Sequence, residues 1–459
     1  MILAGRSSVL AGALAALAMV LGAGPAARAD QAPPAAAADN AATLFQNVRI
    51  FNGKSGVLLG PSNVLVSGKV IQKISSSPID AGPGARVIDG GGRVLMPGLT
   101  DLHWHTMLIR ATPQVMLVSD VGYTTLLAGA EAEATLMRGF TTVRDMGGPS
   151  FSLKRAIDEG VLVGPRIYPS GAMISVTSGH GDFRTLPELP RAMGEHSRIE
   201  VLGGAMIADS PDEVRLRARE QLMQGASQVK LTAGGGVASP FSPLDVSTFT
   251  EAELRAAVEA AENWGTVVCT HTYTSASMQR AIAAGVRCIE HGHLMDEPTA
   301  RLIAEKGVWL STQPFVDLSM AAGMGPSEQA KLAQVVSGTD NVYKLVRKYK
   351  IKTAFGTDIL FSPALAARQA QGLVDLTRWY TPAEALIMAT STNGQMLRET
   401  TGLRNPYPGA IGVVEEGAFA DLLLVNGDPL QDIKLVTDPE RNFLVIMKDG
   451  KIYKDLVSN

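Results

Sequence analysis

Two histidines, His103 and His105, lie one residue apart at the end of the apolar run "LTDLHWH". Side chains of a β-strand alternate between its two faces, so both imidazoles would lie on the same face. Imidazole nitrogen is a preferred ligand of divalent transition metals, and the pair could therefore begin a metal site. Taken alone, this spacing is also compatible with chance.

Other residues of the same chemistry follow further apolar runs. The chain has only seven histidines, and three more of them end the runs "VVCTHTY" and "RCIEHGHL". Asp358 is the last residue of "TAFGTD", where its alternative role is the N-cap of a helix. We predict that the strand ends bring these side chains together at one metal site, formed from His103, His105, His271, His291 or His293, and Asp358.

Lys230 stands between Val229 and Leu231 in "ASQVKL", at the end of a run and not on a helix surface. A buried amine without a partner is costly and should lose its proton. A neutral amine can take up carbon dioxide as a carbamate, whose two oxygens would bridge two divalent ions. Without the carbamate, four histidines and one aspartate are enough ligands for one ion only, so the carbamate is what makes a two-metal site possible. The alternative is a lysine that reaches solvent or forms a salt bridge.

The elements that position these residues recur along the chain. Eight apolar runs lie between residues 99 and 356, and most are separated by amphipathic stretches that end at glycine. Their number and spacing predict an α/β fold, a (β/α)8 TIM barrel over residues 99–403, whose active face is at the C-terminal strand ends. The weakly patterned stretch 179–210 is long enough to predict a lid or binding element.

The two ends of the chain have a different pattern. Residues 43–98 and 404–459 carry short β-type runs broken by glycine and proline, and neither part can bury a face alone. We predict one small discontinuous β-sandwich domain built from both. Residues 1–29 have the basic start, the apolar run and the Ala27-Arg28-Ala29 end of a signal peptide, and 30–42 read as a linker. We therefore expect an exported protein, periplasmic or secreted, with no membrane span after signal cleavage.

Composition narrows the class of function. The chain has 459 residues, 46% of them hydrophobic, and a net charge of -3, so nothing favours binding of nucleic acid. Its only cysteines are Cys269 and Cys288. Cys269 lies two residues before His271 and Cys288 three before His291, which on regular strands places the thiols on opposite sides. A disulfide is therefore not expected.

With these motifs in order, the chain resembles the metal-dependent amidohydrolase superfamily over residues 43–455. "MPGLTDLHWH" is close to its first-strand signature, apart from Thr100 where Ile or Val is common, and "GAFADLLLVNGDPLQDI" is close to its C-terminal β-domain signature. The resemblance implies two divalent ions, expected to be Zn²⁺. It favours His291 over His293 as the ligand from its strand. It assigns His103, His105 and Asp358 to one ion, His271 and His291 to the other, and Lys230, as a carbamate, to both.

Two ions sharing one water would lower its pKa from about 15.7 toward about 7. Asp358 would then take the proton of that water and deliver it to the leaving amine. His180 in "TSGHGD" is a candidate contact to the substrate carbonyl, and His293 would lie near the substrate. Tyr273 and Arg184 could bind a carboxylate, although a core tyrosine and a solvated arginine are the simpler interpretations. Asp101 is either a residue that orients an imidazole or a turn residue.

Within the superfamily, the chain most resembles imidazolonepropionase-like enzymes, Xaa-Pro and Xaa-Arg dipeptidases and ochratoxin amide hydrolases. This resemblance implies cleavage of an amide bond to a C-terminal amino acid, in a dipeptide or in an N-acyl amino acid such as ochratoxin A. We also expect a homo-oligomer.

Other functions remain open at this point. A lactonase or phosphotriesterase would share every ligand. A mononuclear deaminase usually carries a glutamate shortly after the histidine of strand 5, where this chain reads "HTYTSASM". A non-catalytic periplasmic binding protein explains export but leaves the histidines unexplained. Cys269 is a poorer nucleophile because it lies deeper on its strand than His271.

Overall fold

Eight parallel strands follow the eight apolar runs and form the barrel of this computed structural model, which describes residues 42–190, 192 and 195–457. Neighbouring strands pair in chain order, and the third is split into two pieces, β8 and β9. The ring closes where the backbone N–H of Asp358 donates to the His103 carbonyl, at 2.8 Å. The strands are β6 (Leu99–Trp104), β7 (Phe140–Asp145), β8 (Arg166–Pro169) with β9 (Met173–Ser175), β11 (Val229–Leu231), β12 (Val268–Thr274), β13 (Cys288–Leu294), β14 (Trp309–Thr312) and β15 (Thr353–Phe355). The predicted (β/α)8 barrel is confirmed.

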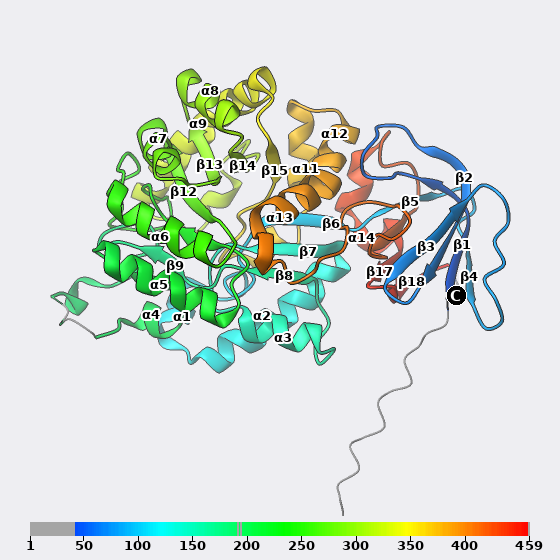
Figure 1. The fold of residues 1–459 in the computed structure, drawn as a ribbon, viewed down its shortest axis with the longest axis horizontal. Helices are drawn as coiled ribbons and strands as arrows, with labels where there is room; N and C mark the ends of the chain where they lie inside the picture. Colours follow the sequence, from blue (N-terminus) through cyan, green and yellow to red (C-terminus); the bar gives the residue numbers. More distant parts are fainter. Residues whose placement is uncertain (1–41, 191, 193–194, 458–459) are drawn as a thin grey trace, which may run out of the picture. The chain divides into compact units, whose positions relative to one another are not determined.

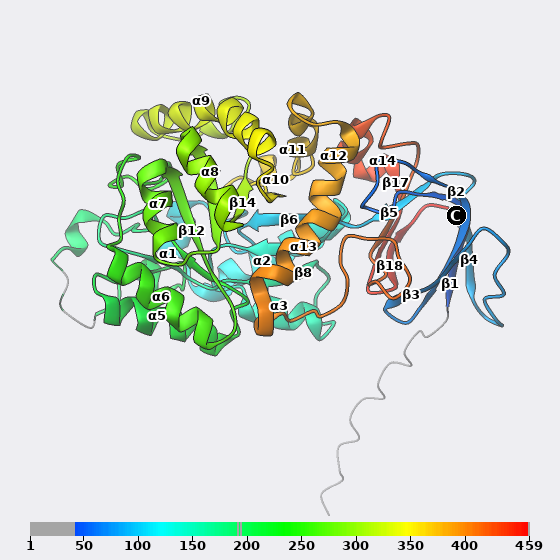
Figure 2. The same cartoon turned by 45° about the horizontal axis from the view of Figure 1, so that its top comes forward.

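Helices lie outside these strands (Figures 1 and 2). Their ends follow local sequence signals: Thr250 and Glu253 form a capping box, and Gly225 ends its helix with a φ of 103°. Among the described residues, no helix combines the length and apolar character that a membrane crossing needs. The helices around the barrel are α1 (Pro113–Val118), α2 (Val121–Met137), α3 (Phe151–Asp158), α5 (Pro211–Gln224), α6 (Glu251–Asn263), α7 (Ser275–Ala283), α8 (Glu297–Lys306), α9 (Pro326–Tyr349), α10 (Pro363–Ala366), α11 (Gln371–Asp375), α12 (Pro382–Ile387) and α13 (Asn393–Thr401).

The two ends of the described chain build one sheet, seen as neighbouring blue and red strands in Figure 1. β5 connects them, because it pairs with β1 on one side and antiparallel with β16 on the other. Phe45, Ile50 and Leu424 are among the side chains of its core. The sheet contains β1 (Thr43–Ile50), β2 (Leu59–Ser67), β3 (Val70–Ser75), β4 (Arg86–Asp89), β5 (Val94–Pro97), β16 (Leu422–Val425), β17 (Phe443–Lys448) and β18 (Lys451–Asp455), and α14 (Pro439–Asn442) precedes β17. The discontinuous β-domain is thus confirmed, whereas the predicted signal peptide and nearly all of the linker lie outside the described residues.

The stretch 179–210 contains more regular structure than its pattern predicts. It includes α4 (Arg198–Val201) and β10 (Ala205–Ile207), which extends the barrel sheet by pairing with β9. The buried carboxylate of Glu200 accepts hydrogen bonds from the backbone N–H groups of Ser197 and Ile207, at 2.8 and 3.2 Å. These bonds connect the short helix to the added strand. Of this stretch, His180 and Phe183 line the cavity described next.

Candidate metal centre

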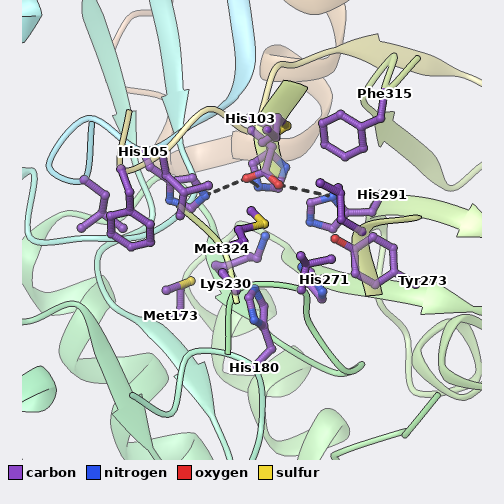
Figure 3. A pocket seen from close by; sticks show the side chains of 18 of the residues that line it. His103, His105, Met173, His180, Lys230, His271, Tyr273, His291, Phe315 and Met324 are labelled. Atoms are coloured by element: carbon purple, nitrogen blue, oxygen red, sulfur yellow. Dashed lines mark hydrogen bonds and ion pairs between the residues drawn. The ribbon is translucent and has the colours of Figure 1, made fainter. Parts of the chain in front are cut away.

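A cavity at the C-terminal ends of the barrel strands brings all the predicted ligands together (Figure 3). Nε2 of His105 and Nε2 of His103 lie 3.1 and 3.4 Å from Oδ1 of Asp358. One possible ligand atom each from His103, His291 and Asp358 lies within 4.8 Å of the others. The ligand candidates that line the cavity are His103 from β6 and His105 just after it, Lys230 from β11, His271 from β12, His291 from β13, and Asp358 just after β15.

Each of the four imidazoles has one ring nitrogen held by an oxygen acceptor. A carboxylate or carbonyl oxygen can only accept, so in His103, His271 and His291 the held nitrogen carries the proton and the other has a free lone pair. In His105 both ring nitrogens lie beside acceptor oxygens, because Asp358 is 3.1 Å from Nε2. Outer contacts of this kind fix the tautomer of metal-binding histidines. The held atoms are His103 Nδ1 by Glu290 (2.7 Å), His105 Nδ1 by the Gly147 carbonyl (3.3 Å), His271 Nε2 by the Gly235 carbonyl (2.9 Å) and His291 Nδ1 by the Gln313 amide oxygen (2.8 Å).

The protonation states suit a cation. Burial lowers the pKa of His103 to about 4 and that of His291 well below its ordinary value, so both are neutral near pH 7. Burial also lowers the pKa of the Lys230 amine. For Asp358, burial alone would raise the pKa, but His103 and His105 outweigh it and the pKa lies below its ordinary value. Neutral imidazoles beside a carboxylate fit a divalent ion such as Zn²⁺.

Strand β13 departs from regular geometry at His291, whose φ is +77°. This left-handed conformation is uncommon for a residue with a side chain and concentrates at functional sites. The predicted opposite orientation of the two thiols is wrong for this reason. Cys269 and Cys288 are directly paired on β12 and β13, and their Sγ atoms lie 3.4 and 3.3 Å from one guanidinium nitrogen of Arg144. Both thiols are free and buried.

Glu290 and Arg144 were not among the predicted site residues, although both are fully buried beneath the ligands. One carboxylate oxygen of Glu290 holds His103, and the other accepts from Arg144 at 2.7 Å. Burial would raise the pKa of Glu290, but the Arg144 charge outweighs it and holds that pKa well below its ordinary value. The sequence does contain a signal that could have identified this pair, because Glu290 and Arg144 are charged residues inside the apolar runs "CIEHG" and "TTVRDMG".

Asp101 does not orient an imidazole. Its carboxylate accepts from the backbone N–H groups of His103 and Thr357, at 3.1 and 3.0 Å, and from the Thr357 hydroxyl at 2.7 Å. It therefore connects β6 to the segment that carries Asp358. Burial raises the pKa of Asp101 to about 6.

The structure brings only two of the four predicted contact residues into the cavity. His180 and Tyr273 line it. His293 does not, because its Nε2 bonds to the Gln313 carbonyl at 2.9 Å and its ring stacks on Phe315 with centroids 5.1 Å apart. Arg184 is also outside the lining, since its guanidinium bonds to Asp182 at 2.6 and 2.8 Å.

The rest of the cavity wall is apolar. Apart from the ligand candidates, His180 and Tyr273, no polar side chain of the described chain lines it. Among the described residues, Asp358 is therefore its only acidic side chain and Lys230 its only amine. The apolar lining consists of Leu108, Met173, Phe183, Val237, Ala238, Phe315, Met320, Met324, Leu332, Leu360 and Phe361.

Comparison with known proteins finds relatives in sequence and in fold. The sequence model of the amidohydrolase family matches residues 94–453. Ochratoxinase of Aspergillus niger is 30% identical over 377 residues, which cover 79% of this chain and 76% of that protein. Its crystal structure matches with a TM-score of 0.78, 26% identity and coverage of 90% of this chain and 96% of that chain. A prolidase crystallised with N-methylphosphonate-L-proline matches with a TM-score of 0.82, 33% identity and coverage of 90% and 100%.

Proposed function

The chain belongs to the amidohydrolase family of metal-dependent hydrolases, and from that premise we propose a binuclear enzyme that cleaves the amide bond to a C-terminal amino acid. The convergence of four imidazoles, a carboxylate and a buried amine at the strand ends carries this proposal. The ligands would be His103, His105 and Asp358 for one ion, His271 and His291 for the other, and Lys230, as a carbamate formed from CO₂, for both.

Two bound divalent ions, which we propose to be Zn²⁺, would supply an acidified water and polarise the substrate carbonyl. Asp358 is ionised, lies beside His103 and His105 and can accept the proton of the attacking water before passing it to the leaving amine. His180 is neutral, because burial lowers its pKa to about 3. Tyr273 keeps its hydroxyl proton, because burial raises its pKa well above 10. Both side chains could donate hydrogen bonds to the carbonyl or carboxylate of the substrate.

The apolar wall favours one substrate class within this chemistry. A dipeptide brings a free ammonium group, and the cavity offers it only Asp358, which is already used at the metal centre. A buried charge without a partner is costly. An N-acyl amino acid has no such charge, and an aromatic or aliphatic acyl group would pack against the apolar lining. Similarity to ochratoxinase supports the same class, of which ochratoxin A is one candidate.

We also propose that the protein is exported and forms a homo-oligomer. Export is supported by the sequence pattern of residues 1–29. It suits an enzyme that meets amides outside the cytoplasm.

A substrate panel tests the proposed activity. Purified protein supplied with Zn²⁺ and bicarbonate should release phenylalanine from N-acyl-phenylalanines with aromatic or long aliphatic acyl groups. The matched Xaa-Phe dipeptides should react at least about tenfold more slowly in kcat/KM, because their ammonium would be unpaired in an apolar pocket. Release can be followed by chromatography of the free amino acid. If only lactones or phosphotriesters in the panel were turned over, the amide assignment would fail.

A further inference from the structure

Lys331 of α9 is a buried lysine that the metal site does not use. Its side chain is 8% exposed, and its Nζ donates to the carbonyls of Gly236, Ser239 and Ser242 at 3.2, 2.9 and 3.1 Å. An ammonium has three donors, so all of them are satisfied by one short segment of backbone. No ion pair of Lys331 with a carboxylate occurs within the described ranges.

The segment held by Lys331 is the loop between β11 and α6, residues 232–250. It contains no strand or helix, only an isolated bridge between Gly234 and Ser247. Its Val237 and Ala238 form part of the cavity wall, and its Gly235 carbonyl holds His271. The position of this loop therefore affects both the cavity and a proposed metal ligand.

The same loop determines how His180 is held. The Oγ of Ser239 accepts from the backbone N–H of Gly181 at 2.9 Å and lies 2.9 Å from Nδ1 of His180. The Ser239 oxygen keeps a second lone pair, so either atom of this contact can be the donor; when the Ser239 hydroxyl donates to Nδ1, the imidazole proton lies on Nε2. Gly236 packs against the same ring, and a Cβ at this position would lie 1.9 Å from Nδ1. The position of the ring is thus set from the loop, and Ser239 is the loop residue that can select its tautomer.

We propose that Lys331 is a positioning residue, which fixes the β11–α6 loop so that the Ser239 hydroxyl donates to Nδ1 of His180 and leaves Nε2–H as the donor toward the substrate. The chain of contacts runs from Nζ to the Ser239 carbonyl, and from the Ser239 hydroxyl to His180. This role rests on the contact between His180 and the substrate that the proposed function includes.

The test is Lys331→Ala with chemical rescue. Without Lys331 the loop should shift and His180 should lose its contact with the reacting carbonyl. Loss of such a donor should lower kcat by about 10²-fold, with KM changed far less, because the contact strengthens in the transition state. Added propylammonium, which restores the donors, should recover part of kcat. Tetramethylammonium, which has no N–H group, should not. The assay uses whichever substrate of the panel the wild-type protein cleaves best. Failure of the amide assignment would then appear in the substrate preference of the wild type, whereas failure of this proposal would appear in the ratio of variant kcat to wild-type kcat.

Two further variants separate positioning from folding. Lys344→Ala on the same helix removes an exposed lysine paired with Asp340 and should leave kcat unchanged. Ser239→Ala keeps the loop carbonyls but loses the contact to His180, so it should lower kcat in the same way, without response to propylammonium. If Lys331→Ala fails to fold, Ser239→Ala still tests whether the loop acts on kcat through His180. Wild-type kcat in Ser239→Ala, or equal effects of the two ammonium ions on Lys331→Ala, would overturn the proposal.

Discussion

Replacing Lys230 by alanine is expected to lower kcat/KM by about 10³-fold or more, because the change removes an electrostatic contact at the reacting centre. Lys230 is 2% exposed, and burial lowers the pKa of its amine, which favours the neutral form that reacts with CO₂. The carbamate would add a second anion beside Asp358 between the two groups of histidines. Short carboxylic acids such as acetate or propionate should restore part of the activity, since they can occupy the vacated space with two oxygens.

Lys448→Ala is the matched control for this variant. Lys448 is also buried, and its Nζ donates to the Gly164 carbonyl at 2.9 Å, but it belongs to β17 of the β-domain. Its replacement should lower the stability of the fold while the folded fraction retains wild-type kcat. Steady-state assays with and without propionate compare the two variants. Full activity in Lys230→Ala, or a loss that no carboxylic acid relieves, would exclude the bridging carbamate.

The second large effect is expected for Asp358→Asn, at about 10⁴-fold in kcat, the upper range for loss of a general base. Asparagine keeps the shape of the side chain but cannot take a proton from water. Asp358 has a φ of +54°, a left-handed conformation that asparagine also adopts readily, so the backbone should not change. The loss should therefore arise from chemistry and from weaker metal binding, not from unfolding.

Asp449→Asn provides the control for backbone conformation. Asp449 has a φ of +52° and lies in the turn between β17 and β18 of the β-domain. Circular dichroism and thermal melting should show both variants folded, and only Asp358→Asn should lose activity. Retention of more than about a tenth of wild-type kcat by Asp358→Asn would contradict its role as the proton acceptor.

Much of this site could be predicted because its ligands obey strand periodicity. His103 in β6 and His105 directly after it line the same cavity, as a period of two predicts, and the barrel brings distant strand ends together there. The pairing of β5 with β16 likewise follows from two end segments that each lack a partner sheet. These features depend on alternation and on apolar burial, which are visible in the sequence.

The remaining features depend on local backbone geometry that alternation does not encode. The left-handed φ of His291 brings Cys288, Glu290 and His291 to the barrel interior together, so counting residues misplaced the thiol and missed Glu290. Arg184 was predicted at the substrate, but the loop turns so that Asp182, two residues earlier, neutralises it. His293 follows two residues with positive φ, His291 and Gly292, and lies behind Phe315, which belongs to the β14–α9 connection.

The metal content of the purified protein tests the central claim most directly. The chain should be loaded with Zn²⁺ in the presence of bicarbonate, freed of loosely bound ions, and measured by inductively coupled plasma mass spectrometry against protein concentration. The arrangement of His103, His105, Lys230, His271, His291 and Asp358 predicts about two divalent ions per chain. A content of one ion or none, under conditions in which the protein is folded and active, would contradict the binuclear centre.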